Sequence, residues 1–129
     1  MGKRRLIPVG FYREFRAGKP HEPSIQDAVG SDAVLHVENI VTYLRDGEVF
    51  VGNPGVVKDV LDPKFGVIGA PHILTDGVYA WPAIFAHYVE RYRIQPPPEF
   101  VRHMSRNGWK VPQGIDLASL ELVRDVGPT

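Results

Sequence analysis

The spacing of apolar residues predicts a helix in the middle of the chain. Between residues 37 and 45 the apolar positions recur every three or four residues, as Val37, Ile40, Val41 and Leu44. This spacing places them on one face of a helix. The β-branched residues of the same segment would also suit a strand. We interpret the segment as a helix, because Asp46-Gly47 supplies a stop directly after it.

Two further short helices are predicted in the second half of the chain. Residues 82–92 carry an apolar stripe, and Pro82 suits the first position of a helix, where its missing N–H is not needed. Three consecutive prolines then favour an extended segment. Residues 99–106 carry a second stripe, which Asn107-Gly108 ends.

Strands are predicted where apolar and polar side chains alternate or β-branched residues cluster. Residues 5–16 alternate, and Pro8 marks them as an edge strand because proline has no N–H to donate to a neighbour. Asp76-Gly77 is typical of a two-residue hairpin. Other short strands are predicted over residues 48–52, 56–61, 67–68 with 72–75, and 78–81.

The two end regions are less regular. Residues 1–35 are predicted to form the N-terminal strand followed by a loop, in which Ser24 caps a short turn over residues 25–29. Residues 115–124 suit either a last strand or a short helix, and we favour the strand.

These elements predict one α+β domain over residues 1–129. It consists of an antiparallel, hairpin-rich sheet with two or three short helices packed on one face. The length of 129 residues, with 43% hydrophobic and 23% charged residues, is typical of a globular domain. The 13 glycines and 12 prolines imply many turns and exclude a long helical bundle.

The lack of cysteine narrows the chemistry of the chain. It excludes a disulfide framework, a thiolate zinc site and a cysteine nucleophile, and it suits a reducing cytoplasm.

The longest stretch without a polar side chain, residues 78–86, is far shorter than the ~20 residues that cross a bilayer. The basic N-terminus lacks the apolar region of a secretory signal. We therefore expect a cytoplasmic protein that does not enter a membrane.

Charge is balanced over the whole chain and uneven along it. Residues 1–20 carry six basic and one acidic side chain, whereas residues 21–78 carry three basic and nine acidic ones. Neighbouring segments of opposite sign can neutralise each other on the surface, or present separate strips to charged partners. A chain with zero net charge lacks a long-range field for a polyanion, so we do not expect nucleic-acid binding.

Catalytic and metal-binding motifs are missing from the sequence. It contains no G-x-S-x-G, G-x-x-x-x-G-K-S/T, H-E-x-x-H, G-x-G-x-x-G or calcium-loop spacing. None of the five histidines lies in an H-x-H or H-x-x-x-H pair, although His87 and His103 could face each other from two helices. Asp59, Asp62 and Asp76 could do acid–base work if desolvated. Turn chemistry already explains the last two, so we predict no catalytic residue, metal ligand or cofactor.

The densest chemical feature is the aromatic segment over residues 75–92. Tyrosine and tryptophan combine a large apolar surface with a polar group, which suits binding sites. They would equally suit the core of a small domain. We predict a binding site formed by Asp76, Tyr79, Trp81, Tyr88 and Tyr92.

The same region resembles a family of small bacterial proteins that share the motifs Y-L-x-x-G and T-D-G-x-Y-x-W-P. The resemblance covers about residues 38–109, and the matching positions are Tyr43-Leu44, Gly47, Asp59, Thr75-Asp76-Gly77, Tyr79, Trp81-Pro82, Tyr88-Val89, Tyr92, Pro98 and Phe100. It implies no catalytic nucleophile, metal ligand or cofactor. By analogy alone, the layout is similar to that of small immunity and accessory proteins of bacterial toxin systems.

Three functional hypotheses follow. The first is a non-enzymatic protein-binding domain, immunity-like or accessory, whose partner is another protein. The second is a small enzyme or ligand-binding domain with a cleft near Asp76, Tyr79 and His87; a buried acid against an imidazole at the base of a deep cavity would favour it. The third is a homo-oligomeric structural subunit, in which the edge strand over residues 6–12 pairs across a two-fold axis.

Overall fold

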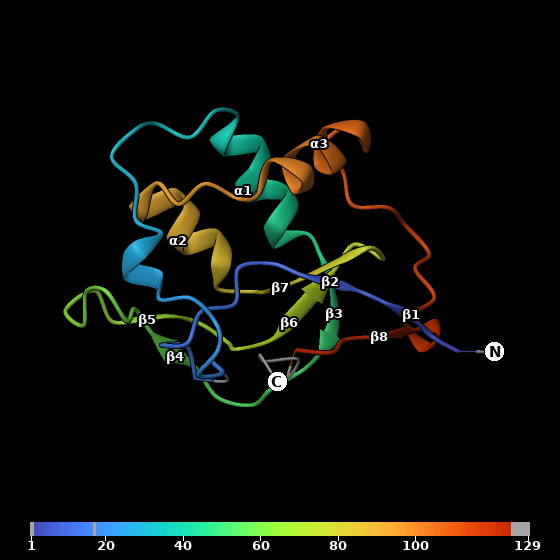
Figure 1. Ribbon diagram of the computed structural model, residues 1–129, viewed down its shortest axis with the longest axis horizontal. Helices are drawn as coiled ribbons and strands as arrows, with labels where there is room; N and C mark the ends of the chain where they lie inside the picture. The colour runs from blue at the N-terminus through green and yellow to red at the C-terminus, as the bar shows by residue number, and fades with distance from the viewer. Residues whose placement is uncertain (1, 17, 125–129) are drawn as a thin grey trace.

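Three α-helices lie together on one side of a sheet (Figure 1). The computed structural model describes residues 2–16 and 18–124. The α-helices are α1 (Val37–Arg45), α2 (Phe85–Tyr92) and α3 (Pro98–Arg106), and the short 3-10 helices are η1 (Ile25–Asp27) and η2 (Leu117–Ser119). The strands are β1 (Arg4–Arg5), β2 (Ile7–Pro8), β3 (Glu48–Val51), β4 (Val57–Lys58), β5 (Val67–Gly69), β6 (Ile73–Thr75), β7 (Tyr79–Pro82) and β8 (Leu120–Glu121). The predicted α+β class is confirmed.

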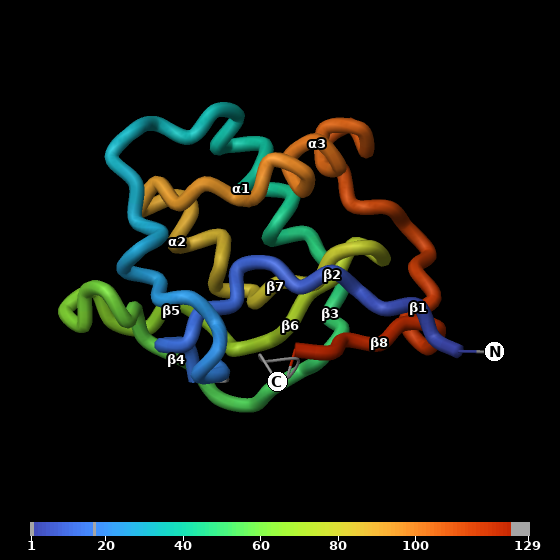
Figure 2. Tube along the Cα trace, viewed as in Figure 1, coloured from blue at the N-terminus to red at the C-terminus, as the bar shows by residue number. Residues whose placement is uncertain are grey.

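The central sheet has four strands in the order β2-β7-β6-β3. The pairs β6–β7 and β3–β6 are antiparallel, whereas β2 runs parallel to β7. Two smaller sheets flank it, an antiparallel pair of β4 and β5 and a parallel pair of β1 and β8. The N-terminal and C-terminal segments therefore lie side by side, as the tube in Figure 2 shows.

The core fills the space between the helices and the sheet. Its largest fully buried side chains are Trp81, Tyr43, Tyr88, Phe85 and Phe100, which come from the central hairpin and all three helices. A smaller cluster of Leu6, Ala80 and Leu120 covers the opposite face of β7. Both faces of that strand are buried, which explains why its residues are apolar without a clear alternation.

The helix predictions succeed at α1 and α3, and one boundary is wrong at α2. The segment with mixed helix and strand character forms α1 over the predicted residues. Pro82 does not begin a helix: it is the last residue of β7 and pairs with Ile73. The Ala83 N–H still donates to the His72 carbonyl at 2.8 Å, so extended pairing continues past the proline and α2 begins later.

The N-terminal strand is much shorter than predicted. It ends at Pro8, and the chain then bends at Gly10, which adopts a φ of 73° and whose Cβ, if present, would lie 2.6 Å from the Phe85 ring. The chain therefore bends where it approaches α2, and residues 13–16 form turns and a bend. β2 is a terminal strand of the central sheet, as Pro8 predicts.

Three other elements differ from their predicted bounds or type because of tertiary contacts. The strand predicted over residues 67–75 divides into β5 and β6, which belong to different sheets. The β6–β7 hairpin closes one residue later than predicted, because the Asp76 N–H donates to the Tyr79 carbonyl at 3.3 Å and leaves Gly77 and Val78 in the loop. Near the C-terminus, η2 precedes the short strand β8. The predicted turn does form at η1, where the Ser24 side chain accepts a hydrogen bond from the Gln26 N–H.

Candidate functional site

The first feature of chemical interest is a buried carboxylate, Asp76, in the β6–β7 turn. Its Oδ1 accepts the N–H groups of Val78 at 2.9 Å and Tyr79 at 2.7 Å. Its Oδ2 accepts the Tyr43 hydroxyl at 2.6 Å and lies 3.1 Å from Nε2 of His103. One side chain therefore joins the turn to α1 and α3.

The environment of Tyr43 reinforces this connection. Burial, and then its hydrogen bond to Asp76, raise the pKa of Tyr43 well above its ordinary value. The Asn107 amide, just after α3, donates to the Tyr43 oxygen at 3.0 Å. Tyr43 therefore stays protonated and serves as both donor and acceptor between two helices.

A second carboxylate, Asp59, repeats the arrangement beside α2. Its Oδ1 accepts the N–H groups of Leu61 at 2.8 Å and Asp62 at 3.0 Å. Its Oδ2 lies 2.7 Å from both the Tyr92 hydroxyl and Nε2 of His87. Burial acts to raise the pKa of Asp59, but the hydrogen bonds from His87, Tyr92 and the backbone outweigh it, and the pKa lies below its ordinary value.

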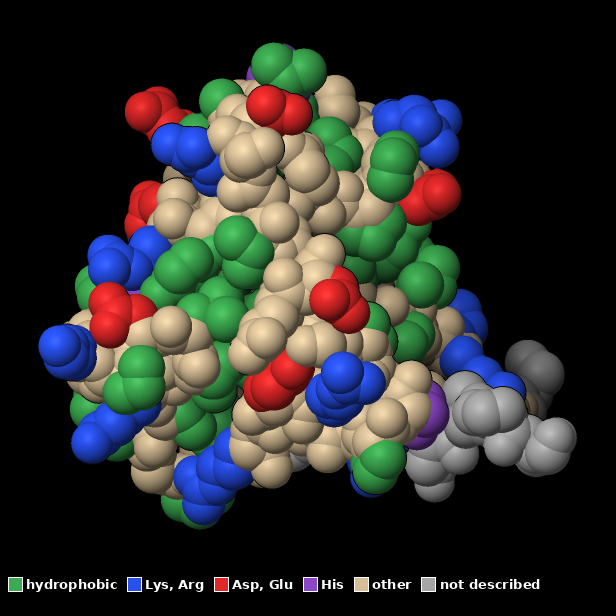
Figure 3. Space-filling model, turned by 60° about the vertical axis from the view of Figure 1, so that its left-hand side comes forward, with side chains coloured by type: hydrophobic (Ala, Val, Ile, Leu, Met, Phe, Trp, Pro, Cys, Tyr) green, Lys and Arg blue, Asp and Glu red, His purple; other side chains and the backbone are tan. Residues whose placement is uncertain are grey.

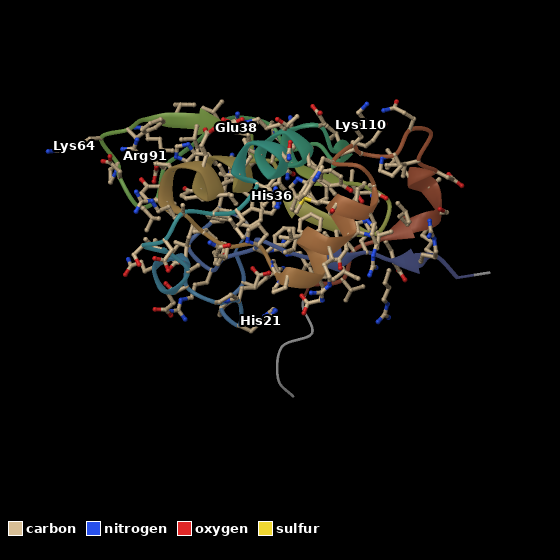
Figure 4. All side chains as sticks on the ribbon, turned by 90° about the horizontal axis from the view of Figure 1, so that it is seen from above. His21, His36, Glu38, Lys64, Arg91 and Lys110 are labelled. Carbon is tan, nitrogen blue, oxygen red and sulfur yellow. The ribbon has the colours of Figure 1, made fainter. Side chains whose placement is uncertain are left out.

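Both imidazoles could in principle act as oriented bases, because each uses Nε2 toward a carboxylate and keeps Nδ1. Their surroundings favour a structural role instead. Each carboxylate is already surrounded by four groups of the fold. These are two backbone N–H groups, one tyrosine hydroxyl and one histidine ring. The His87 ring is packed among Phe65, Tyr88 and Tyr92. Figure 4 shows Arg91, on α2 near this network, toward the end of the molecule that carries Lys64.

The predicted binding residues do not form an exposed surface. Trp81 and Tyr88 are fully buried, and Asp76 is nearly so. The Trp81 indole donates to the Leu44 carbonyl at 2.9 Å, and the Tyr88 oxygen accepts the Val60 N–H at 2.9 Å. Tyr79 and Tyr92 remain partly exposed. The aromatic segment is thus mainly the core of the domain.

The alternative cleft was predicted near Asp76, Tyr79 and His87, but a different histidine lies beside Asp76. The imidazole that reaches Asp76 is that of His103, whose ring centroid lies 5.1 Å from that of Tyr79. His87 is instead paired with Asp59. The two histidines serve two separate carboxylates, a division that the order of residues along the chain does not reveal.

A third feature is an apolar groove on another part of the surface. Its volume is about 1060 Å³. Residues from six segments line it, including Phe11, Tyr12, Leu35, Phe85, Pro96, Pro97, Pro98 and Val101. The residues of the two carboxylate networks are not among the described residues that line this groove. Sequence reasoning missed the groove, because its residues lie far apart in the chain.

The groove has a buried base and a polar rim. Phe85 and Ile40 belong to the core, whereas Leu35 is 79% exposed. The Arg124 guanidinium donates to both oxygens of Glu22, at 2.8 and 3.1 Å, and lies 3.9 Å from the centre of the Phe11 ring. Figure 4 shows that the other rim residues His21 and His36 come from separate segments, the N-terminal loop and the start of α1.

The pKa shifts predict that stability falls at both extremes of pH. The folded pKa of Asp59 is lowered, so its contribution is present above about pH 4 and is lost as the pH falls through the folded pKa. Burial raises the pKa of Tyr88 to about 12, so its contribution is present below about pH 10 and is lost as the pH rises toward that value. Urea midpoints measured across this range should therefore drop at both ends.

A matched pair of variants tests the assignment. Asp59→Asn should make the acid drop shallower, and Tyr88→Phe should do the same for the alkaline drop, which other buried tyrosines also shape. An acid drop of unchanged depth in Asp59→Asn would show that other carboxylates are responsible.

Comparisons with other proteins add no relatives to this description. Within residues 2–16 and 18–124, each helix is too short or too polar to cross a lipid bilayer. Nor does the described part of the chain hold three or more His, Asp or Glu side chains arranged for a metal ion. No protein-family model matches the sequence, and neither a curated protein nor a solved structure is significantly similar to it.

Proposed function

We propose that this domain is a protein-binding module that receives a segment of its partner in the apolar groove. The observation that carries the proposal is the groove itself, about 1060 Å³ in volume and lined largely by aromatic, proline and aliphatic side chains. Apolar surface in a concave site is stabilised when a ligand removes it from water. Figure 3 shows that hydrophobic side chains also reach the surface on one face, between charged groups.

The walls of the groove are held in place without a ligand. The Glu22–Arg124 pair fixes one wall, and both side chains are about nine-tenths buried, with 8% and 10% exposed. The Arg93 guanidinium donates to the Ser31 carbonyl at 2.7 Å, which holds the loop that leads to the lining residues Ala33 and Leu35. A preformed site loses little conformational entropy on binding, which favours recognition of a partner.

The carboxylate networks support this function indirectly. Asp59 ties the β4–β5 unit to α2, and Asp76 ties the central hairpin to α1 and α3. They stabilise the framework on which the groove is built. We therefore propose a non-enzymatic role, and retain the immunity-like role in a bacterial cytoplasm as a hypothesis within it.

The two rival functions have weaker physical support. The enzyme needs an imidazole that faces a substrate cavity, whereas His87 and His103 are not among the described groove residues. The two-fold pairing needs free N–H groups on residues 6–12. Leu6, Ile7 and Val9 already donate to Glu121, Val78 and Ala80 within the chain, at 2.8, 2.9 and 2.9 Å.

Affinity capture with two matched variants tests the proposal. Leu35→Asp places a charge on the exposed rim of the groove and is expected to weaken partner binding by about tenfold or more. Val67→Asp makes the same kind of change at a site that is 54% exposed and outside the groove, and should leave binding intact. Quantitative mass spectrometry of captured proteins gives the readout. A partner held equally by both variants would rule out the groove as its site.

A further inference from the structure

The charges on the groove point to the chemistry of its occupant. Resting on the function proposed above, we infer that the groove receives an apolar peptide segment of the partner that carries acidic side chains. The groove presents both acidic and basic side chains, and only some of them are neutralised within the fold.

The acidic side chain of the groove is neutralised from within. Glu22 receives two hydrogen bonds from Arg124, and the pair is largely buried. A carboxylate in a bidentate pair of this kind has little attraction left for an incoming cation. Glu22 therefore does not select a basic occupant.

The basic side chain Arg102 is not neutralised in this way. It lines the groove from the exposed side of α3. Arg102 is absent from the ion pairs found among residues 2–16 and 18–124. The exposed His21 and His36 lie on the same rim, and an imidazole adds no negative charge there. The rim thus offers an excess of positive charge to an occupant, and a carboxylate there would gain a charge-assisted hydrogen bond.

The apolar lining determines which other side chains an occupant needs. Phe11, Tyr12, Leu35 and Val101 offer apolar contacts, and the three prolines add a rigid wall. An occupant therefore needs aromatic or aliphatic side chains beside its carboxylates. The volume of about 1060 Å³ lies at the top of the usual range for small ligands, roughly 300–1,000 Å³, which favours a length of polypeptide over a small molecule.

One aromatic contact extends the ring surface beyond the groove. The rings of His36 and Trp109 lie 5.2 Å apart. Both residues adopt left-handed backbone conformations, with φ of 59° and 61°. The contact places the Trp109 ring beside the lining residue His36, where it offers further ring surface to a bound segment.

The experiment uses a phage-displayed library of random dodecapeptides, selected on the full-length protein. Selected peptides should be enriched in Asp and Glu and in Leu, Phe and Trp. A synthetic peptide from the selection should bind about tenfold or more weakly to Leu35→Asp and to Arg102→Glu. Its affinity for the unmodified protein should also fall as salt rises from about 50 to 500 mM. The matched control is Lys64→Glu, a charge reversal outside the groove, which should leave affinity unchanged.

The variants separate this inference from the function on which it rests. Peptides that bind in a Leu35-dependent manner, but are basic or indifferent to Arg102→Glu, would overturn the acidic occupant and leave the groove function standing. Failure to select peptides that depend on Leu35 would overturn both. A third outcome would also overturn the inference. If the selected peptides show no acidic enrichment, and sodium laurate binds and displaces them as effectively as a competing peptide does, the occupant is an anionic lipid.

Discussion

Replacing Trp81 with alanine is expected to lower the free energy of unfolding by about 3–5 kcal/mol. The side chain is fully buried, and its ring centroid lies 5.3 Å from that of Phe100 and 6.1 Å from that of Tyr43. Truncation would leave a cavity between the central hairpin and two helices, and the Leu44 carbonyl would lose the indole donor. Since domains of this size are typically stable by about 5–15 kcal/mol, this loss would unfold a large fraction of the protein.

Urea denaturation followed by far-ultraviolet circular dichroism measures this effect. Trp81→Phe serves as the control, because it keeps most of the apolar ring, loses the indole hydrogen bond, and should be less destabilised than Trp81→Ala. If Trp81→Ala were as stable as the unmodified protein but failed to bind its partner, Trp81 would be a binding residue instead of a core residue.

Replacing Asp76 with alanine is expected to cost a comparable amount, about 3–5 kcal/mol. The carboxylate receives the N–H groups of Val78 and Tyr79, the Tyr43 hydroxyl and the contact from His103. Alanine would leave all four groups without this acceptor in a region where little water can replace it. The β6–β7 turn would also lose its link to α1 and α3.

Two variants show which part of the network carries the effect. Tyr43→Phe removes a single donor to Asp76 and should cost about 1 kcal/mol. Asp76→Asn keeps one acceptor oxygen for the turn and should be intermediate between the two. Free energies of unfolding from urea titrations at neutral pH provide the comparison. A loss below about 1 kcal/mol in Asp76→Ala would contradict the view that this carboxylate joins the three elements.

The resemblance to a bacterial family stays a prediction, but the structure explains why its motif residues could depend on one another. Tyr43 and Asp76 are hydrogen-bonded, and the Leu44 carbonyl accepts the Trp81 indole N–H. A Cβ at Gly47 would lie 2.6 Å from that indole ring. The motif therefore describes one packed junction between α1 and the central hairpin, and its aromatic residues serve packing more than recognition.

Local patterns predicted the elements whose stability is mainly local. The apolar stripe and the following Asp46-Gly47 were sufficient to place α1, and Ser24 was sufficient to place the turn at η1. These signals operate over three or four residues, a distance that the sequence displays directly. The α+β class followed from the same elements.

Pairing partners could not be predicted in this way. Pro82 suits either the first turn of a helix or the end of a strand, and its pairing with Ile73 decided for the strand. Similarly, Asp59 and Asp76 have the pattern of ordinary turn residues, and one oxygen of each does accept the N–H groups of its turn. Their second oxygens are bound by tyrosines and histidines 27 to 33 residues away, and that connection depends on how the helices pack.

By itself, the sequence determined the class of the fold, the positions of α1 and α3, and the lack of any cysteine chemistry. The tertiary structure decided that the aromatic segment lies inside the domain and that an apolar groove forms elsewhere on the surface. The physical reason is that side-chain spacing within a few residues sets local conformation, whereas burial and cavities depend on segments that meet only after the whole chain has folded.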